Sequence, residues 1–354
     1  MPSPLSACRE PPTRVLVVED SPTARALLVH ILGSDPEIQV VGEARDGVEG
    51  VELTRKLRPH VVTMDIKMPR MDGFQATKEI MITAPTPIVV VTGCLDDGEL
   101  EVSMHALRAG ALTVLAKPPG LESPDHDRAA RELVTTVKAM AQVKVVRHWR
   151  PRSSPEISLP PAARRGSPRR AVAIAASTGG PAALQHLLGE LPADFPAPLL
   201  VVQHITPGFV GGLAAWLNTI CDFQVRVAVN GEVLHRGTVY LAPDGHHLGV
   251  TSRGTIALST EPPVGGFRPS GSSLFESVAA AYGASAVAVI LTGMGDDGVK
   301  GLRAIRQTGG QIIAQDEESC VVFGMPGAAI AAELPDLVLP ITAIPRRLVE
   351  IVQS

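Results

Sequence analysis

The sequence predicts an α/β protein made of two doubly wound parallel-sheet domains that are joined by a Pro/Arg-rich linker. Its 354 residues exceed the usual size of one domain, which is about 100–200 residues. Apolar residues make up 45% of the chain, which is enough for sizeable cores. In both halves, short runs of Val, Ile and Ala alternate with amphipathic stretches, a pattern typical of parallel strands connected by helices.

Composition excludes several other classes of protein. The aromatic content is only 3%, which argues against a stacking platform for bases or sugars. No CxxC pair occurs among Cys8, Cys94, Cys221 and Cys320, so neither a disulfide framework nor a cysteine zinc site is expected. No apolar run approaches the roughly 20 residues that span a bilayer, and the first residues lack the pattern of an export signal. We therefore expect a cytoplasmic protein without membrane insertion.

The first third of the chain opens with the buried-strand pattern RVLVV at residues 14–18. Ser21 then supplies an N-cap and Pro22 the first helical position, and the apolar spacing predicts a helix through Ile31. Five strands alternating with five helices imply a parallel sheet with crossovers on both faces. Three of the further strands are expected at 61–64, 87–91 and 111–115, and the further helices near 47–57, 73–83, 97–109 and 127–142.

Polar residues follow the ends of these strands. Glu19 and Asp20 follow the first strand, Asp65 the third, Thr92 the fourth and Lys117 the fifth. In such a sheet, ligand-binding and catalytic residues lie just outside the carboxyl ends of the strands. Three converging carboxylates repel one another unless a hard divalent cation holds them, and Mg²⁺ suits such a site. The lysine and the hydroxyl would then bind the oxygens of an incoming phosphoryl group. The alternative is that the acidic residues only cap helices. Helix capping would explain a single Asp, but not five polar residues that all follow strand ends.

The segments VVEDS, MDIKMPRMDG, VVVT and AKP resemble the receiver domain of two-component response regulators over roughly residues 13–135. The resemblance implies a flavodoxin-like fold in which Asp65 accepts the phosphoryl group. Glu19, Asp20 and Asp65 would bind Mg²⁺, Thr92 would be the switch hydroxyl, and Lys117 would contact the phosphate. One departure is Val114, because this position is often aromatic in receivers.

The segment of residues 144–170 is strongly basic. It carries a net charge of +7, whereas residues 1–143 carry −5 and residues 171–354 carry −6. With five prolines and little apolar periodicity, it is predicted to be an extended, solvated linker. An alternative is that this basic segment lies against one of the two acidic domains or against an acidic partner. Since neither flanking part is basic in total, no nucleic-acid partner is expected.

The second half begins with the small-residue strand AVAIAA at 171–176, which leads into Ser177-Thr178-Gly179-Gly180-Pro181 and a helix. A serine at such a turn presents its hydroxyl above the sheet edge. The glycines free backbone N–H groups, and the start of a helix favours developing negative charge. The same turn would equally suit phosphate binding or simple helix capping.

Two further strand ends favour catalysis. The predicted strand 199–203 leads into His204, and the predicted strand 287–291 leads into a glycine-rich turn with Asp296 and Asp297. Ser, His and Asp at three strand ends of one sheet are the parts of a nucleophile, base and orienter relay, which recurs on unrelated folds.

The motifs AASTGGP, VVQHI, YLAPDGHHL, ILTGMGDDG and AQDEESCVVFGMP resemble the catalytic domain of the CheB family of chemotaxis protein-glutamate methylesterases. With the receiver, the resemblance spans nearly the whole chain from residue 13. It implies a Rossmann-like hydrolase domain without a cofactor, with Ser177 as nucleophile, His204 as base and Asp297 as orienter. Asp296 occupies the variable position of the motif. The oxyanion donors would be the backbone N–H groups of Met294 and Thr178. His246 and His247 look like metal ligands, but adjacent residues of a strand face opposite sides.

Three positions depart from the family pattern. In RPSGSSLF (268–275), Gly271 replaces an apolar residue and Ser272 an acidic one, and Gly327 stands where a basic residue is usual after GMP. We expect hydrolysis to survive these changes, and we expect them to loosen or re-aim substrate recognition.

The resemblance implies a cytoplasmic enzyme that hydrolyses glutamate γ-methyl esters on methyl-accepting chemoreceptors, releases methanol and also deamidates glutamines. Its phosphodonor would be a CheA-like histidine kinase. The unphosphorylated receiver would cover the cleft around Ser177, and the protein is expected to be a monomer.

The expected organisation is a disordered tail (1–12), a receiver (13–135), a linker (136–169) and a catalytic domain (170–354). Two alternative functions are a phosphorylation-gated binding protein with an inactive triad and a transcriptional regulator. The complete Ser/His/Asp set argues against the first rival, and the acidic, strand-rich second half argues against the second.

Overall fold

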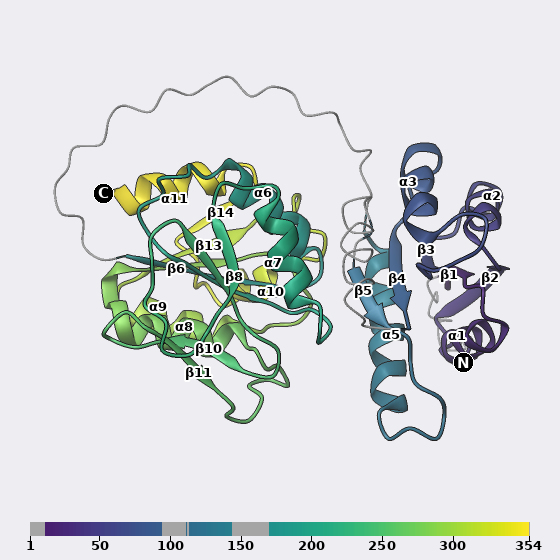
Figure 1. Ribbon diagram of the computed structural model, residues 1–354, viewed down its shortest axis with the longest axis horizontal. Coiled ribbons are helices and arrows are strands. Elements are labelled where there is room, and N and C mark those ends of the chain that lie inside the picture. Colours follow the sequence, from purple (N-terminus) through teal and green to yellow (C-terminus); the bar gives the residue numbers. More distant parts are fainter. Residues whose placement is uncertain (1–10, 94–110, 112, 144–169, 354) are drawn as a thin grey trace, which may run out of the picture. The chain divides into compact units, whose positions relative to one another are not determined.

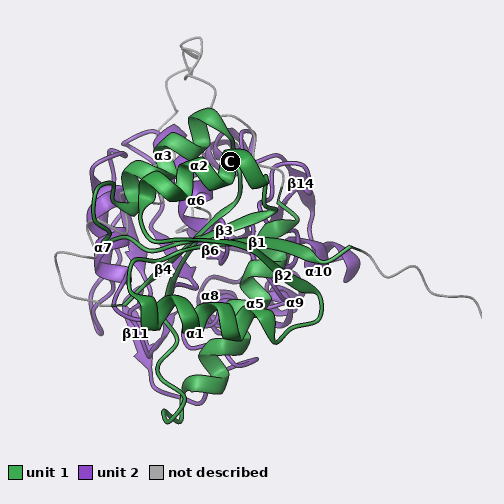
Figure 2. Cartoon of the chain, turned by 90° about the vertical axis from the view of Figure 1, so that its right-hand side faces the viewer, with its two compact units in different colours: residues 1–94, 108–148 green, residues 95–107, 149–354 purple. Residues whose placement is uncertain are grey.

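The computed structural model describes residues 11–93, 111, 113–143 and 170–353. These residues form two compact units, which are described separately below (Figure 2). The expected tail (apart from residues 11–12), the expected helix over 97–109 and most of the expected linker lie outside the described residues. No helix in the described ranges is both long and apolar enough to cross a membrane.

The first unit contains a five-stranded parallel sheet in the order β2-β1-β3-β4-β5. This is the flavodoxin-like order, and it confirms the predicted doubly wound class. Figure 2 shows α1 and α5 on one face of the sheet and α2 and α3 on the other. The strands are β1 (Thr13–Val18), β2 (Ile38–Ala44), β3 (Val61–Met64), β4 (Ile88–Thr92) and β5 (Thr113–Ala116), and the helices are α1 (Pro22–Gly33), α2 (Gly47–Leu57), α3 (Gly73–Thr83) and α5 (His126–Ala141).

Local sequence explains where these elements begin and end. Ser21 caps α1 as predicted, since its hydroxyl accepts the N–H of Ala24 at 3.4 Å and Pro22 is the first helical residue. Strands β1, β3 and β4 have fully buried centres because helices cover both faces. Helix α5 continues to Ala141, six residues beyond the expected end of the receiver at residue 135.

The second unit contains a seven-stranded parallel sheet in the order β14-β13-β12-β6-β7-β9-β8 and a separate antiparallel hairpin, β10-β11. Figure 1 shows α6 and α11 on one face of this sheet and α8 and α9 on the other. The strands are β6 (Ala171–Ala176), β7 (Leu199–Gln203), β8 (Gln224–Val227), β9 (Thr238–Leu241), β10 (His247–Val250), β11 (Ile256–Ser259), β12 (Ala286–Ile290), β13 (Gln311–Gln315) and β14 (Leu337–Leu339), and the helices are α6 (Gly180–Glu190), α7 (Val210–Asn218), α8 (Gly271–Tyr282), α9 (Val299–Gln307), α10 (Met325–Ala331) and α11 (Ile344–Gln353), with a short 3₁₀ turn, η1 (Gly283–Ser285).

Strand β6 lies at the centre of this unit. It is buried along its whole length, between β12 and β7. Its alternating alanines let α8 approach closely: a β-carbon on Gly271, the first residue of α8, would lie 2.7 Å from Cβ of Ala175. The small residues of β6 therefore bring α8 and the carboxyl ends of three strands close to one another.

Candidate functional site

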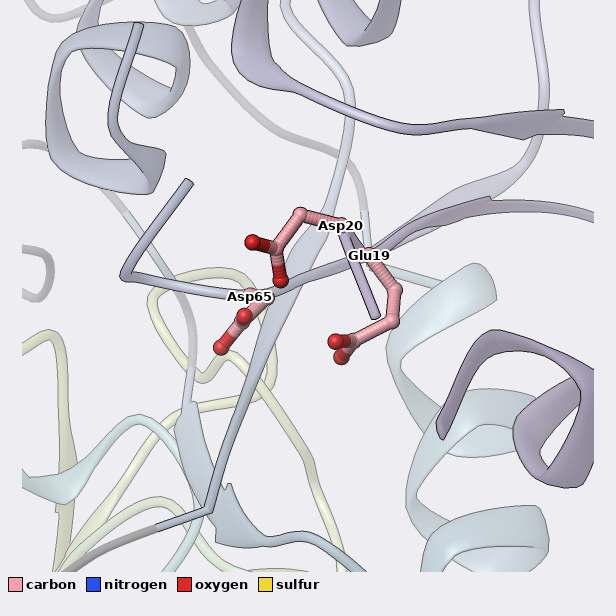
Figure 3. Close-up of side chains that lie close together, drawn as sticks. All are labelled: Glu19, Asp20 and Asp65. Atoms are coloured by element: carbon pink, nitrogen blue, oxygen red, sulfur yellow. The ribbon is translucent and has the colours of Figure 1, made fainter. Parts of the chain in front are cut away.

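The carboxyl edge of the first sheet carries an acidic cluster. Glu19 and Asp20 directly follow β1, and Asp65 directly follows the neighbouring strand β3. One carboxylate oxygen from each lies within 4.8 Å of the others, and Figure 3 shows the three side chains turned toward one another. Glu19 and Asp65 are buried, whereas Asp20 is the least covered of the three. The structure thus brings together the three residues that the sequence predicted to converge.

Lys117 reaches this cluster from the end of β5. Its Nζ lies 2.8 Å from Oε2 of Glu19 and 3.1 Å from Oδ2 of Asp65. Thr92 ends the intervening strand β4, is buried, and accepts the backbone N–H of Lys117 on its carbonyl at 2.7 Å. The five predicted residues therefore share one edge of the sheet. Val114 is buried within β5.

Two carboxylates of this cluster, those of Glu19 and Asp65, share the ammonium group of Lys117. Burial raises the pKa of Asp65 above its ordinary value, although Lys117 and the Ile66 N–H act in the opposite direction. Burial likewise raises the pKa of Glu19, and the Asp65 charge adds to this effect. The cluster thus gathers three carboxylates, two of which pair with Lys117. A hard divalent cation such as Mg²⁺ fits this set of oxygen donors, because it would relieve their repulsion.

Ser177 lies at the carboxyl edge of the second sheet, at the turn from β6 into α6. Its backbone N–H donates to the carbonyl of Thr292 at 3.0 Å, and its own carbonyl accepts the N–H of Gly180 at 2.8 Å. Gly179 has a φ of +78°, and a β-carbon there would collide with Val321. A glycine is therefore required at this point of the turn.

His204 follows the adjacent strand β7. Ala176 of β6 and Gln203 of β7 are paired in register, so Ser177 and His204 are next neighbours on adjacent strands. The backbone confirms this, since the N–H of His204 donates to the carbonyl of Ala176 at 2.9 Å. Adjacent parallel strands are about 4.8 Å apart. The serine and the histidine therefore lie side by side.

Asp297 completes this group from the loop after β12. Its Oδ2 lies 2.9 Å from Nε2 of His204. Burial alone would raise the pKa of Asp297. The hydrogen bond and charge of His204, together with the hydrogen bonds from Ser270 and Gly271, outweigh burial and lower the pKa to about 2. Asp297 is therefore ionised at neutral pH, which is what a group that orients an imidazole and stabilises its cation requires.

The other predicted residues surround this group. A β-carbon on Gly293 would lie 2.7 Å from Cβ of Ser177, so the 292–294 loop packs directly against the serine turn. No described residue accepts a hydrogen bond from the backbone N–H of Met294 or of Thr178. Asp296 is exposed, in contrast to its buried neighbour Asp297.

His246 and His247 contact different backbone carbonyls, those of Asp244 and Pro262. The two rings therefore bond to different groups. Only His247 lies on a strand, β10, so the alternation expected for two strand residues does not apply to His246.

The structure also reveals site residues that the sequence analysis missed. Gln203 donates from Nε2 to the carbonyl of Ser177 at 2.7 Å and to the carbonyl of His204 at 2.8 Å, so one buried side chain ties both loops together. The Phe267 ring stacks on the imidazole of His204, with centroids 4.1 Å apart and an angle of 3° between the planes. The position of Gln203 directly before His204 was the only signal for it, and Phe267 carried none.

The departures at Gly271 and Ser272 lie at the start of α8, beside Asp297. Both residues are buried against Asp297, whose oxygens accept the N–H of Gly271 at 2.6 Å and the N–H of Ser272 at 3.1 Å. The Ser272 hydroxyl accepts the N–H of Gly298 at 2.9 Å. The backbone N–H groups of these two residues support the Asp297 carboxylate, and their effect on substrate recognition stays a prediction. Gly327 lies in α10 beside the Phe323 ring, and its effect on recognition stays a prediction.

Comparisons with known proteins agree with this architecture. The response regulator receiver domain model matches residues 15–123, and the CheB methylesterase model matches residues 172–348. The protein-glutamate methylesterase/protein-glutamine glutaminase 4 of Myxococcus xanthus is 57% identical over 95% of this chain and 96% of its own length. A relative from Anaeromyxobacter dehalogenans, protein-glutamate methylesterase/protein-glutamine glutaminase 3, is 58% identical over 95% of this chain and 98% of its own length. The crystal structure of the Thermotoga maritima CheB methylesterase catalytic domain is 41% identical, with a TM-score of 0.51, and the match covers 52% of this chain and 99% of that one.

A receiver domain followed by a methylesterase domain defines a response regulator whose output is an enzyme. The chain belongs to the CheB family of methylesterases.

Proposed function

We propose that this protein is a phosphorylation-regulated serine hydrolase that demethylates glutamate γ-methyl esters on chemoreceptors and releases methanol. The observation that carries this proposal is the 2.9 Å contact between Nε2 of His204 and the ionised Asp297, made next to Ser177. The names of the relatives, protein-glutamate methylesterase/protein-glutamine glutaminase, support the substrate class. They also support deamidation of glutamines, with ammonia in place of methanol.

The arrangement suggests the following steps. Nε2 of His204 is hydrogen-bonded to Asp297, so Nδ1 acts as the base. It takes the proton of the Ser177 hydroxyl while Oγ attacks the γ-carbonyl carbon of the substrate. The backbone N–H groups of Met294 and Thr178 hold the resulting oxyanion. The imidazolium then returns its proton to the departing methoxide, and methanol leaves an acyl-enzyme on Ser177. Water, deprotonated by His204, then attacks this ester, and His204 returns the proton to Oγ of Ser177 as the free glutamate leaves.

The receiver supplies the regulatory input in this proposal. Asp65 accepts a phosphoryl group from a histidine kinase resembling CheA, and Lys117 and Thr92 bind its oxygens. Glu19, Asp20 and Asp65 are the residues that would hold Mg²⁺, which neutralises phosphoryl charge when bound. The unphosphorylated receiver inhibits the hydrolase, and phosphorylation relieves this inhibition.

The proposed organisation follows from the same reasoning. Residues 13–135 and 170–354 form the receiver and the catalytic domain, and the basic segment between them connects the two. The substrate is the cytoplasmic helices of methyl-accepting receptors. The enzyme acts in the cytoplasm as a monomer, and its hydrolase domain needs no cofactor. The proposed function involves neither nucleic-acid binding nor membrane insertion.

Methanol release from membranes that contain methylated chemoreceptors tests the activity. Wild-type protein should release methanol, and Ser177→Ala should abolish release while both units remain folded. Acetyl phosphate with Mg²⁺ should stimulate the wild type but not Asp65→Asn, whose basal rate should persist. Undiminished release by Ser177→Ala would refute the serine mechanism, and equal stimulation of Asp65→Asn would refute the regulatory role of Asp65.

A further inference from the structure

The ring of Phe267 covers one face of the His204 imidazole. The centroids are 4.1 Å apart and the planes differ by only 3°, so the two rings are stacked. Phe267 itself is only half-buried. Core packing therefore does not explain why a large aromatic side chain is placed there.

Among the described residues, the His204 ring makes a single side-chain hydrogen bond. Nε2 pairs with Asp297, whereas Nδ1 is buried and has no hydrogen-bond partner among the described residues. A single hydrogen bond fixes one ring atom but lets the ring turn about that bond. A parallel ring at van der Waals distance opposes this turn, because one edge of the imidazole would be driven into it. Phe267 thus supplies the second constraint on the orientation of the imidazole.

The loop that carries Phe267 is held in shape by its own contacts. Val264 and Phe267 exchange two backbone hydrogen bonds of 3.0 Å across Gly265 and Gly266, both of which have positive φ, as a tight hairpin turn requires. The next residue, Arg268, donates to the carbonyl of Thr260 at 3.0 Å and to that of Glu261 at 3.3 Å. The aromatic ring is therefore positioned before any substrate arrives.

We propose that Phe267 is a positioning residue of the hydrolase. It holds the His204 imidazole in the plane in which Nε2 meets Asp297, so that Nδ1 can take the proton of the Ser177 hydroxyl during the reaction. The π face of Phe267 also lies against the positive charge that the imidazole gains when it takes the serine proton. This inference rests on the proposed function, since it takes His204 as the general base.

The test compares Phe267→Leu, which removes the ring, with Phe267→Tyr, which keeps it, in the full-length protein. Tyr282→Leu is the matched control, because Tyr282 is another half-buried aromatic residue but lies at the far end of α8 from Asp297. Three readouts are needed: kcat and KM for methanol release, the second-order rate at which an alkyl fluorophosphonate modifies Ser177, and the low-field proton resonance of the His204–Asp297 hydrogen bond. His204→Gln assigns this resonance by its loss.

Phe267→Leu should lower both kcat and the phosphonylation rate about tenfold, with KM unchanged, because the imidazole loses its orientation. Its low-field resonance should broaden, and Phe267→Tyr and Tyr282→Leu should retain wild-type rates and spectra. Wild-type phosphonylation by Phe267→Leu would overturn the inference, as would loss of activity in Phe267→Tyr. A rise in KM alone would also overturn it, because Phe267 would then be a substrate contact. Methanol release by Ser177→Ala would instead refute the proposed function.

Discussion

Ser270 donates its hydroxyl hydrogen to Oδ1 of Asp297 over 2.8 Å, in a position where both residues are buried. The same carboxylate accepts the N–H groups of Gly271, Ser272 and Gly298, in addition to its contact with His204. The start of α8 is therefore built around the ionised form of Asp297. Because this form is stabilised in the folded protein, Asp297 links the pH dependence of stability to the geometry of the site.

Ser270→Ala should destabilise the hydrolase unit by about 2 kcal/mol at pH 7, because a buried carboxylate loses a donor. The folded-state pKa of Asp297 is about 2, below its ordinary value of 3.8. The stabilisation is therefore present above pH 4 and is lost as the pH falls toward 2. Urea unfolding at pH 7 and at pH 3 measures this, and the difference between wild type and variant should shrink at pH 3. Ser270 also caps α8, but loss of a cap alone would give a difference that does not change with pH.

Asp297→Asn should reduce kcat about 10³–10⁴-fold, since the amide leaves His204 without an anionic partner. Asp296→Asn is the matched control, because it makes the same chemical change at the adjacent, exposed position. Methanol release by the two variants gives the comparison. Equal activities of the two variants would show that the contact between His204 and Asp297 has no part in the reaction.

Gly179→Ala should destabilise the hydrolase unit and slow methanol release, because its β-carbon would collide with Val321 and displace the Ser177 turn. Gly231→Ala separates this collision from backbone strain. Gly231 has a similar φ, +82° against +78°, but open space around its β-carbon position. Both variants should lose about 1–2 kcal/mol through the left-handed backbone. Only Gly179→Ala should lose more and also lose activity, and thermal melting together with kcat measures both effects.

Mg²⁺ should stabilise the receiver unit more at pH 7.5 than at pH 5. Burial raises the folded-state pKa values of Glu19 and Asp65 above their ordinary values, so the apo unit loses stability as the pH rises through those values and the buried charges form. Bound Mg²⁺ offsets that charge, and binding releases protons at lower pH. Differential scanning calorimetry with and without Mg²⁺ measures the shift in melting temperature.

Glu19→Gln should reduce the Mg²⁺-dependent shift, whereas Glu52→Gln, on the exposed side of α2, should not. A shift that is the same at both pH values and in both variants would contradict a site at Glu19, Asp20 and Asp65.

Much of both sites could be predicted because the chemistry follows directly from the ends of buried strands. Glu19, Asp65, Ser177 and His204 each come one residue after a strand whose apolar pattern is visible in the sequence. Parallel strands place such positions at one edge, so adjacency needs no knowledge of tertiary structure. Strand bounds differed by one or two residues, as for β5, which begins at Thr113 instead of residue 111.

The rest depended on contacts between distant segments. Phe267 lies 63 positions after His204, in a loop whose Pro and Gly residues predict a turn but not what the turn covers. The bond of Ser270 to Asp297 depends on how closely α8 approaches β6, which no local pattern shows. That Gly271 and Ser272 are buried against Asp297 could not be predicted for the same reason, and their expected effect on substrate recognition stays a prediction.

Mapping the covalent adduct of the full-length protein with an alkyl fluorophosphonate tests the central claim most directly. The account predicts one adduct, located by peptide mass spectrometry on Ser177. Adduct formation should be lost in His204→Gln, and methanol release should fall in proportion to the labelled fraction. An adduct on any other residue, or full methanol release by protein that is completely labelled on Ser177, would contradict the account.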